Sequence, residues 1–318
     1  MSDLRTAAET AVRQCMNLRS DESCAVVTDD RREEIGEALY AVASEITDDA
    51  VLLRYPPGPQ HGAEPPEPVA AAMRSADVVL APTSKSLSHT RARGAATDAG
   101  TRAATLPGIT EEVFTTGLDA DYERIREECD RMFERVAGAE EIRVTSPQGT
   151  DVTFQPGERE WHSDTGIVHE PGGFSNLPAG EVFVSPESAN GTYVVDGTMH
   201  PHGLLEGKIR IDVEDGYVTE ISDPEVAAEV EEAAESVGRD AYNLAELGIG
   251  TNVAVTELVG SVLLDEKAAG TVHVAIGDDA GIGGDTDAPI HSDGILREPT
   301  VYADGEVVDL PKSNGRSP

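Results

Sequence analysis

The segment APIHSDGIL near the end of the chain places a histidine and an aspartate, His291 and Asp293, one residue apart. Imidazole and carboxylate groups are both ligands of divalent metals, and residues two apart on an extended segment share one face of the strand. The two side chains can therefore reach the same ion. His162 and Asp164 repeat this spacing in an acid-rich chain, so the short motif does not identify a site by itself.

Three further segments combine a metal-capable side chain with apolar or glycine-rich neighbours. They contain Glu181, Glu246, Glu266 and His273. A charged or polar group beside residues that favour burial must be paired or must coordinate an ion. Three of them also have a purely structural explanation. Glu181 can cap a turn, Glu246 can be a paired carboxylate, and His273 can be a hydrogen-bonded core residue.

Two other groups of residues are weaker candidates. His200 and His202 in MHPHG have the spacing of a small metal clip, but the surrounding proline and glycine predict an exposed loop. His162 and Asp164 adjoin Trp161, the single tryptophan of the chain. They are candidates for contacts with a substrate.

The composition limits the classes of partner. Lysine and arginine total 24 against 60 aspartates and glutamates, which gives a net charge of −36. Nucleic acids and anionic membranes bind basic surfaces, so neither is an expected partner. Because salt shortens the range of charge repulsion, so acidic a chain is typical of a salt-rich cytoplasm, and we expect a halophilic source. Three cysteines without a CxxC motif, and the lack of an apolar segment of membrane-spanning length, favour a cytoplasmic protein.

Residues 1–138 alternate short apolar segments with helical patterns. The alternation predicts an α/β domain of Rossmann-like type, with a parallel sheet and crossover helices. Its expected strands are 24–29, 50–55, 77–82 and 103–108. No glycine-rich phosphate loop follows these strands, so a nucleotide site is not expected.

From residue 139 the pattern favours strands. Aspartate–glycine pairs at 215–216 and 304–305 lie between alternating segments, as in tight hairpins. One predicted helix begins at Pro224 and ends before Gly238. We therefore predict a β-rich α+β domain over 139–318 that contains the candidate metal ligands.

The order of the candidate segments resembles the metal-binding half of the thermophilic metallo-aminopeptidases, the aminopeptidase T and aminopeptidase S (leucyl aminopeptidase) family. The segment NLPAGEVFVSP at 176–186 matches the family's glutamate motif, and Glu246 matches its glycine-flanked glutamate. The family's D-E and H-[IV]-A-[IL]-G elements match residues 265–277, and its terminal H-x-D matches 291–293. Four elements in the same order are far more specific than any one of them.

The resemblance implies a two-metal hydrolase, here a short member of halophilic archaeal type. The implied ligands are Glu181, Glu246, Glu266, His273, His291 and Asp293. Carboxylate and imidazole ligands suit Zn, Co, Mn or Mg, and a pair of such ions lowers the pKa of a bridging water. Glu246, the implied catalytic residue, would bridge the ions or accept the proton of that water. The implied activity is leucyl-type removal of N-terminal residues from small peptides by a cytoplasmic homodimer.

Two features are similar to a different branch of the same family. The peptidases carry a tyrosine seven residues after the histidine ligand, where this chain has Ala280. The chain is also shorter than the peptidases and similar in length to ring-cleaving dioxygenases that act on dihydroxypyridine. Those relatives hold one Fe(II) by two histidines and a carboxylate, which His273, His291 and Asp293 would supply. A mononuclear iron dioxygenase is therefore the alternative to the peptidase, and a non-catalytic domain is a third hypothesis.

Overall fold

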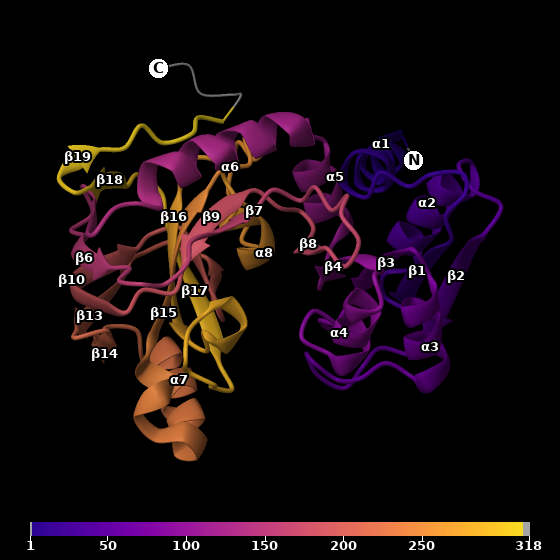
Figure 1. Ribbon diagram of the computed structural model, residues 1–318. Coiled ribbons are helices and arrows are strands. Elements are labelled where there is room, and N and C mark those ends of the chain that lie inside the picture. The colour runs from indigo at the N-terminus through magenta and orange to yellow at the C-terminus, as the bar shows by residue number, and fades with distance from the viewer. Residues whose placement is uncertain (1, 314–318) are drawn as a thin grey trace. The chain divides into compact units, whose positions relative to one another are not determined.

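The computed structural model describes residues 2–313, and the chain divides into two compact units. The first unit comprises the residues up to Arg126 together with the segment Thr165–Ala179. The second comprises Glu127–Asp164 and the residues from Gly180 onward. Figure 1 shows the elements of both units.

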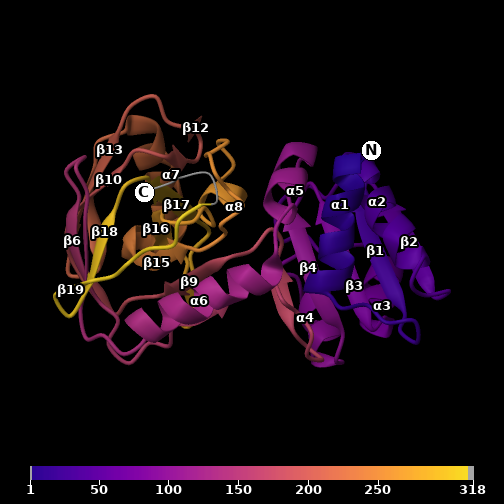
Figure 2. The same ribbon diagram turned by 90° about the horizontal axis from the view of Figure 1, so that it is seen from above.

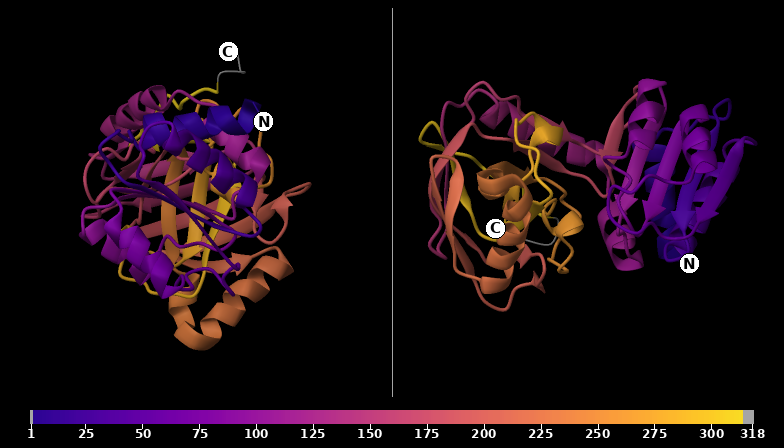
Figure 3. Two further views of the ribbon diagram at one scale, coloured as in Figure 1. Left: turned by 90° about the vertical axis from the view of Figure 1, so that its right-hand side faces the viewer. Right: turned by 90° about the horizontal axis from the view of Figure 1, so that it is seen from below.

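The first unit is built around a parallel sheet of order β2-β1-β3-β4-β8. Its strands are β1 (Cys24–Asp29), β2 (Ala50–Tyr55), β3 (Val78–Thr83), β4 (Arg102–Pro107) and β8 (Phe174–Asn176). Its helices are α1 (Ser2–Glu9), continued by a π-helical segment at Thr10–Cys15, then α2 (Glu33–Ser44), α3 (Glu67–Ser75), α4 (Arg91–Asp98) and α5 (Glu111–Leu118). Helices α1, α2 and α5 lie on one face of the sheet and α3 and α4 on the other (Figures 1 and 3). Because both faces are covered, β1 and β3 are buried along their whole length.

Helix α6 (Tyr122–Val136) begins in the first unit and continues into the second. The predicted boundary between domains 1–138 and 139–318 therefore differs from the division in the structure, which falls inside this helix. Residues 165–179 then return to the first unit, where β8 pairs in parallel with β4. A strand of three residues has no local sequence pattern, so this return could not be read from the sequence.

The second unit is β-rich, and its described residues form two seven-stranded sheets that Figure 2 shows as separate layers. The first has the order β14-β13-β10-β6-β5-β18-β19, and the second has the order β12-β11-β17-β16-β15-β9-β7. The strands of the first are β5 (Ile142–Thr145), β6 (Asp151–Gln155), β10 (Ser188–Val195), β13 (Ile209–Glu214), β14 (Tyr217–Ile221), β18 (Thr300–Ala303) and β19 (Glu306–Val307). Those of the second are β7 (His162–Asp164), β9 (Glu181–Val184), β11 (Thr198–Met199), β12 (Gly203–Leu204), β15 (Leu244–Gly250), β16 (Val272–Gly277) and β17 (His291–Leu296). Helices α7 (Pro224–Val237) and α8 (Val262–Asp265) and 3-10 turns at Gly238–Tyr242 and Ala280–Ile282 complete the unit.

Local sequence signals account for several of these elements. The aspartate–glycine turns at 215–216 and 304–305 have positive φ at both residues and close the predicted β13–β14 and β18–β19 hairpins. Asp223 accepts hydrogen bonds from the first amides of α7, and Pro224 occupies the first turn. The predicted combination of an α/β unit and a β-rich unit is confirmed. No helix within residues 2–313 has the length and apolar character that a membrane span requires.

Candidate metal centre

Four adjacent strands of the second sheet of the β-rich unit carry most of the predicted ligands. Glu181 lies on β9, Glu246 on β15, His273 on β16, and His291 and Asp293 on β17. The strands are neighbours in the order β17-β16-β15-β9, so residues far apart in the sequence become adjacent. The alternation of side chains along β17 directs its two candidates to one face of the sheet.

Two backbone features of β15 shape the centre. The pairing of β15 with β16 shifts register between Leu244 and Glu246, and such a bulge re-aims the side chain beside it. Gly248 lies opposite His273, and a Cβ at this position would be 2.0 Å from His273 Nε2. The imidazole therefore lies across the strand in a space that a glycine leaves free.

The carboxylates and imidazoles face one another at short distances. His273 Nε2 is 3.2 Å from Glu246 Oε1 and 3.3 Å from Glu181 Oε2. His291 Nε2 is 3.4 Å from Glu246 Oε2 and 3.6 Å from Asp293 Oδ2. Glu246 thus contacts both histidines, one with each of its oxygens.

Among the described residues, these side chains form two groups that could each hold an ion, with the ligand atoms of a group within 4.8 Å of one another. One group is Glu181, Glu246 and His273, and the other is Glu246, His291 and Asp293. Glu266, the sixth predicted ligand, lies in neither group. The three residues of the predicted iron triad also do not form one group, because His273 is grouped with Glu181 and Glu246, whereas His291 and Asp293 form a group with Glu246.

The residues present fit a divalent metal. Apart from His291, the members of both groups are no more than 9% exposed. Glu181 Oε2 is buried and makes no hydrogen bond among the described residues, although His273 Nε2 lies 3.3 Å away, so this oxygen can accept a cation or a substrate hydroxyl. His291 Nδ1 lies 2.7 Å from the carbonyl oxygen of Asp278 and donates to it, which directs Nε2 to the centre. This contact is typical of metal-binding histidines.

Burial and mutual contacts set the protonation of the centre. Burial would raise the pKa of Glu246, but hydrogen bonds from His273 and His291 hold this pKa below its ordinary value. Burial raises the pKa of Glu181 to about 8, against the opposing charge of Lys267. Burial would lower the pKa of His273, but its contacts with Glu246 and Glu181 raise it to about 9. Because metals bind unprotonated ligands, loading the centre would release protons.

Lys267 is a member of this cluster that the sequence analysis missed. It is 3% exposed, and its Nζ lies 2.6 Å from Glu181 Oε1 and 2.6 Å from Glu266 Oε1. Burial would lower the pKa of Lys267, but the two carboxylates hold it well above its ordinary value. The chain has only four lysines, and this one directly follows the Asp265-Glu266 pair. Its position beside a predicted ligand was the feature of the sequence that could have identified it.

An aromatic pair adjoins the centre. The ring of His162 stacks on Phe183 with the ring centroids 5.2 Å apart, and His162 Nε2 lies 3.1 Å from the carbonyl oxygen of Ile282. Phe183 and His273 are both register partners of Gly248, on either side of it. Side chains opposite one another in a sheet share a face, so the aromatic pair lies on the face that carries His273.

The remaining candidates lie outside both groups. Asp164 is the register partner of Glu181 on the edge strand β7. In the MHPHG segment, His200 Nδ1 lies 3.1 Å from a Glu229 oxygen, and His202 Nε2 lies 3.0 Å from an Asp223 oxygen. These two histidines thus form separate pairs with acids of α7 and its cap, and neither belongs to the two groups of potential metal ligands found among the described residues.

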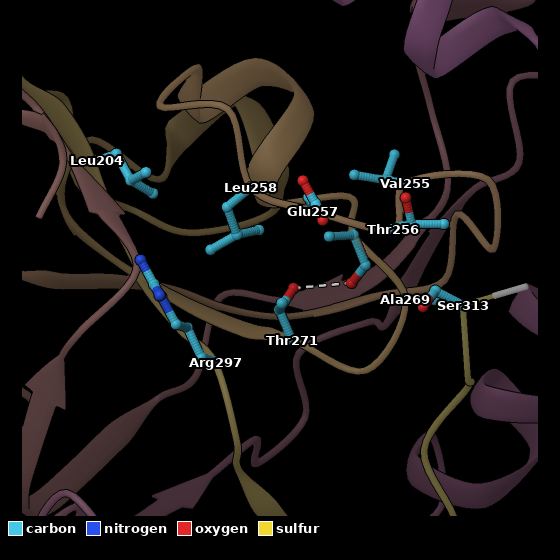
Figure 4. Close-up of a pocket in the computed structure, with 10 residues that line it drawn as sticks. Leu204, Val255, Thr256, Glu257, Leu258, Ala269, Thr271, Arg297 and Ser313 are labelled. Carbon is cyan, nitrogen blue, oxygen red and sulfur yellow. Dashed lines mark hydrogen bonds between the residues drawn. The ribbon is translucent and has the colours of Figure 1, made fainter. Parts of the chain in front are cut away.

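A pocket of about 270 Å³ borders the segment that carries Lys267 (Figure 4). Leu204, Val255 and Leu258 supply apolar walls, and Arg297 and Thr271 supply polar groups. The Thr271 hydroxyl donates to the Ala268 carbonyl oxygen at 2.8 Å. None of the six predicted ligands lines this pocket, so it is distinct from the candidate metal centre.

Known proteins resemble this chain in sequence profile and in fold. The NicX family, described as 2,5-dihydroxypyridine 5,6-dioxygenase, matches residues 3–310. A solved structure of 2,5-dihydroxypyridine dioxygenase from Pseudomonas putida KT2440 has a TM-score of 0.79 at 19% identity, covering 98% of this chain and 97% of that one. Wild-type AmpT from Thermus thermophilus has a TM-score of 0.67 at 18% identity, covering 97% of this chain and 99% of that one. No protein of curated function matches the sequence.

These findings confirm the predicted resemblance to aminopeptidase T at the level of the fold, which is all that such low identities show. They contradict the predicted leucyl aminopeptidase activity. The family match names a dioxygenase over nearly the whole chain, and the dioxygenase structure has the higher TM-score of the two. The alternative reaction is therefore the better supported. Nothing in the comparisons supports a halophilic archaeal source.

Proposed function

Because the chain belongs to the family described as 2,5-dihydroxypyridine 5,6-dioxygenase, we propose that it opens a dihydroxylated pyridine-type ring with dioxygen at an iron centre. The observation that supports this most directly is the convergence of Glu246, His291 and Asp293 in one group. Imidazole with carboxylates is a ligand set that suits ferrous iron. Bound iron would supply the one-electron chemistry that lets dioxygen react with an aromatic ring.

The surrounding contacts hold these three ligands in place. His291 and Asp293 project from one face of β17, and Glu246 projects from the bulged end of β15. The Asp278 carbonyl fixes the His291 ring, while His273 contacts the Glu246 oxygen that does not face His291. Ligands held by such contacts need little further ordering when a metal binds, and this preorganisation strengthens binding.

Two features suit a flat hydroxylated ring. The stacked His162 and Phe183 provide an aromatic surface, against which a planar ring packs favourably. Glu181 Oε2 makes no hydrogen bond within the part of the chain that the structure describes, and burial raises the pKa of this carboxyl to about 8. This oxygen can therefore exchange a proton with a ring hydroxyl near neutral pH.

The test is the reaction itself. The full chain is loaded with Fe(II) without oxygen, mixed with 2,5-dihydroxypyridine and oxygenated buffer, and followed by an oxygen electrode and by the absorbance of the ring. We expect one dioxygen to be consumed for each ring lost, and no consumption by His291→Ala. His200→Ala, which changes an exposed histidine outside both groups, is the matched control and should retain the reaction. The proposal fails if folded, iron-loaded protein consumes no dioxygen with this or any other dihydroxypyridine isomer.

The homodimer that the family resemblance implied and the cytoplasmic location that the composition favoured remain predictions. Size-exclusion chromatography with light scattering measures the first directly.

A further inference from the structure

Lys267 is a cation buried within the candidate metal centre. It follows α8 and is 3% exposed. Its ammonium donates to one oxygen of Glu181 and one oxygen of Glu266, each at 2.6 Å. Hydrogen bonds between ionised groups are short and strong, and a lysine is rarely buried so completely unless its charge is paired. The two carboxylates are therefore what keeps this ammonium inside the protein.

One of these two carboxylates, Glu181, is a ligand that a second metal ion would require, and the other lies beside it. Glu181 belongs to the group with Glu246 and His273, and Glu266 is the neighbouring acid at the end of α8. The ammonium takes one oxygen from Glu181 and one from Glu266. The third acid, Glu246, is shared with the other group and is therefore already needed by the first ion.

We propose that the Lys267 ammonium fills the second cation position of the centre, so that each chain takes one divalent ion, at Glu246, His291 and Asp293. This inference deepens the proposed function and rests on the proposed metal centre. Glu181, Glu246, Glu266 and Asp293 carry at most four negative charges, so Lys267 and one divalent ion leave at most one of these charges uncompensated. A second divalent ion would leave a net positive charge in a buried site, beside an ammonium that repels it.

An ammonium and a metal ion do different work at this position. Lysine offers three hydrogen-bond donors and no site at which a water can be coordinated. Lys267 can thus orient Glu181 without helping to activate a nucleophilic water, which is the task of the second ion in two-metal hydrolases. The presence of Lys267 is therefore consistent with a centre that uses a single ion, and with the finding that the peptidase prediction is wrong.

The test is the number of ions bound, measured without substrate or dioxygen. The full chain is saturated with Co(II), freed of excess metal, and analysed by mass spectrometry of the metal and by the visible absorption of bound Co(II). We expect one Co(II) per wild-type chain and two per Lys267→Met chain, because methionine is similar in size but frees both carboxylates. Lys267→Arg keeps the charge and should bind one ion. Lys208→Met, at an exposed lysine, is the matched control and should also bind one.

Two Co(II) ions in the wild-type chain would overturn the inference whatever the variants do, and so would the absence of bound Co(II). A folded Lys267→Met chain that binds one ion would also overturn the inference. Circular dichroism measures whether the variant is folded. Lys267→Gln serves as a second uncharged replacement. Failure of the proposed function can be distinguished from failure of this inference. If the wild type binds one ion and the Lys267→Met variant binds two, but the protein opens no ring, the inference is supported and the proposed function is not.

Discussion

Replacing Gly248 by alanine should weaken metal binding while leaving the backbone fold intact. The added Cβ would lie 2.0 Å from His273 Nε2 and 2.1 Å from Cε1 of the same ring. The backbone of this residue lies in a fully buried strand without a positive φ, so alanine itself is not strained there. The imidazole must move instead, because ordinary contact begins near 3.4 Å and the ring is about 1.4 Å too close.

The expected loss of metal affinity follows from the contact that is lost when the His273 ring moves. His273 Nε2 is already 3.2 Å from Glu246 Oε1, so a displacement of that size removes the contact that orients Glu246. Loss of a supporting contact to a metal ligand typically lowers metal affinity by about 10- to 100-fold. At saturating metal this equals a loss of about 1.4–2.7 kcal/mol of metal-induced stabilisation. Crowding of the buried ring costs the metal-free protein a further ~1–3 kcal/mol.

Two measurements separate these effects. Calorimetric titration with Co(II) gives the affinity, and thermal unfolding with and without Co(II) gives the stabilisation by metal. Gly207→Ala is the matched control, since a Cβ there meets nothing within 4 Å, and it should behave as the wild type. A folded Gly248→Ala chain with wild-type Co(II) affinity would show that the His273 ring does not support the centre, and the reasoning from this geometry would be wrong.

Two further predictions concern stability. The hydrogen bond from His202 to Asp223 raises the pKa of His202, so protonation stabilises the fold below the ordinary value of about 6.5, and this contribution is lost as the pH rises through the higher folded value. The difference in melting temperature between the wild type and His202→Gln should therefore be larger near pH 6 than near pH 9, and an equal difference at both would contradict the assignment. The net charge of −36 predicts that the melting temperature rises between about 0.1 M and 1 M salt, over which the Debye length falls from about 10 Å to 3 Å. An unchanged melting temperature in a salt series would show that charge repulsion does not limit stability.

The elements of the fold that are determined by local sequence patterns could be predicted from the sequence. The strand at 24–29 is a short buried segment between helical patterns, and α7 begins at Pro224 and ends before Gly238 as its sequence signals indicate. The division into units could not be predicted, because it depends on the pairing of β8 with β4 across some seventy residues of chain. Three residues, Phe174–Asn176, carry too little periodicity to predict a strand, and their partner is chosen by the tertiary fold.

The candidate site also has features that the sequence predicts and features that it does not. The types and spacing of His291 and Asp293 predicted a shared face, which the alternation of β17 provides. That Glu181, Glu246 and His273 would lie close to this pair could be predicted only from the order of the family's motifs. No local pattern indicates which strands become neighbours. Gly248 and the bulge beside Glu246 were missed because their role arises only when β16 lies against β15.

The contradicted activity has a physical explanation in the same residues. Carboxylates and imidazoles on four adjacent strands can hold divalent ions for hydrolysis or for oxygen chemistry, so the ligand set does not select the reaction. The selection must come from the groups around it, and these differ from what a two-metal peptidase needs. Lys267 supplies a fixed ammonium against Glu181, and Ala280, where the peptidases have a tyrosine, is exposed and offers no side-chain donor for an oxyanion. Under the proposed function, the neighbours of the ligands would distinguish the two reactions, and a motif built from the ligands alone could not separate them.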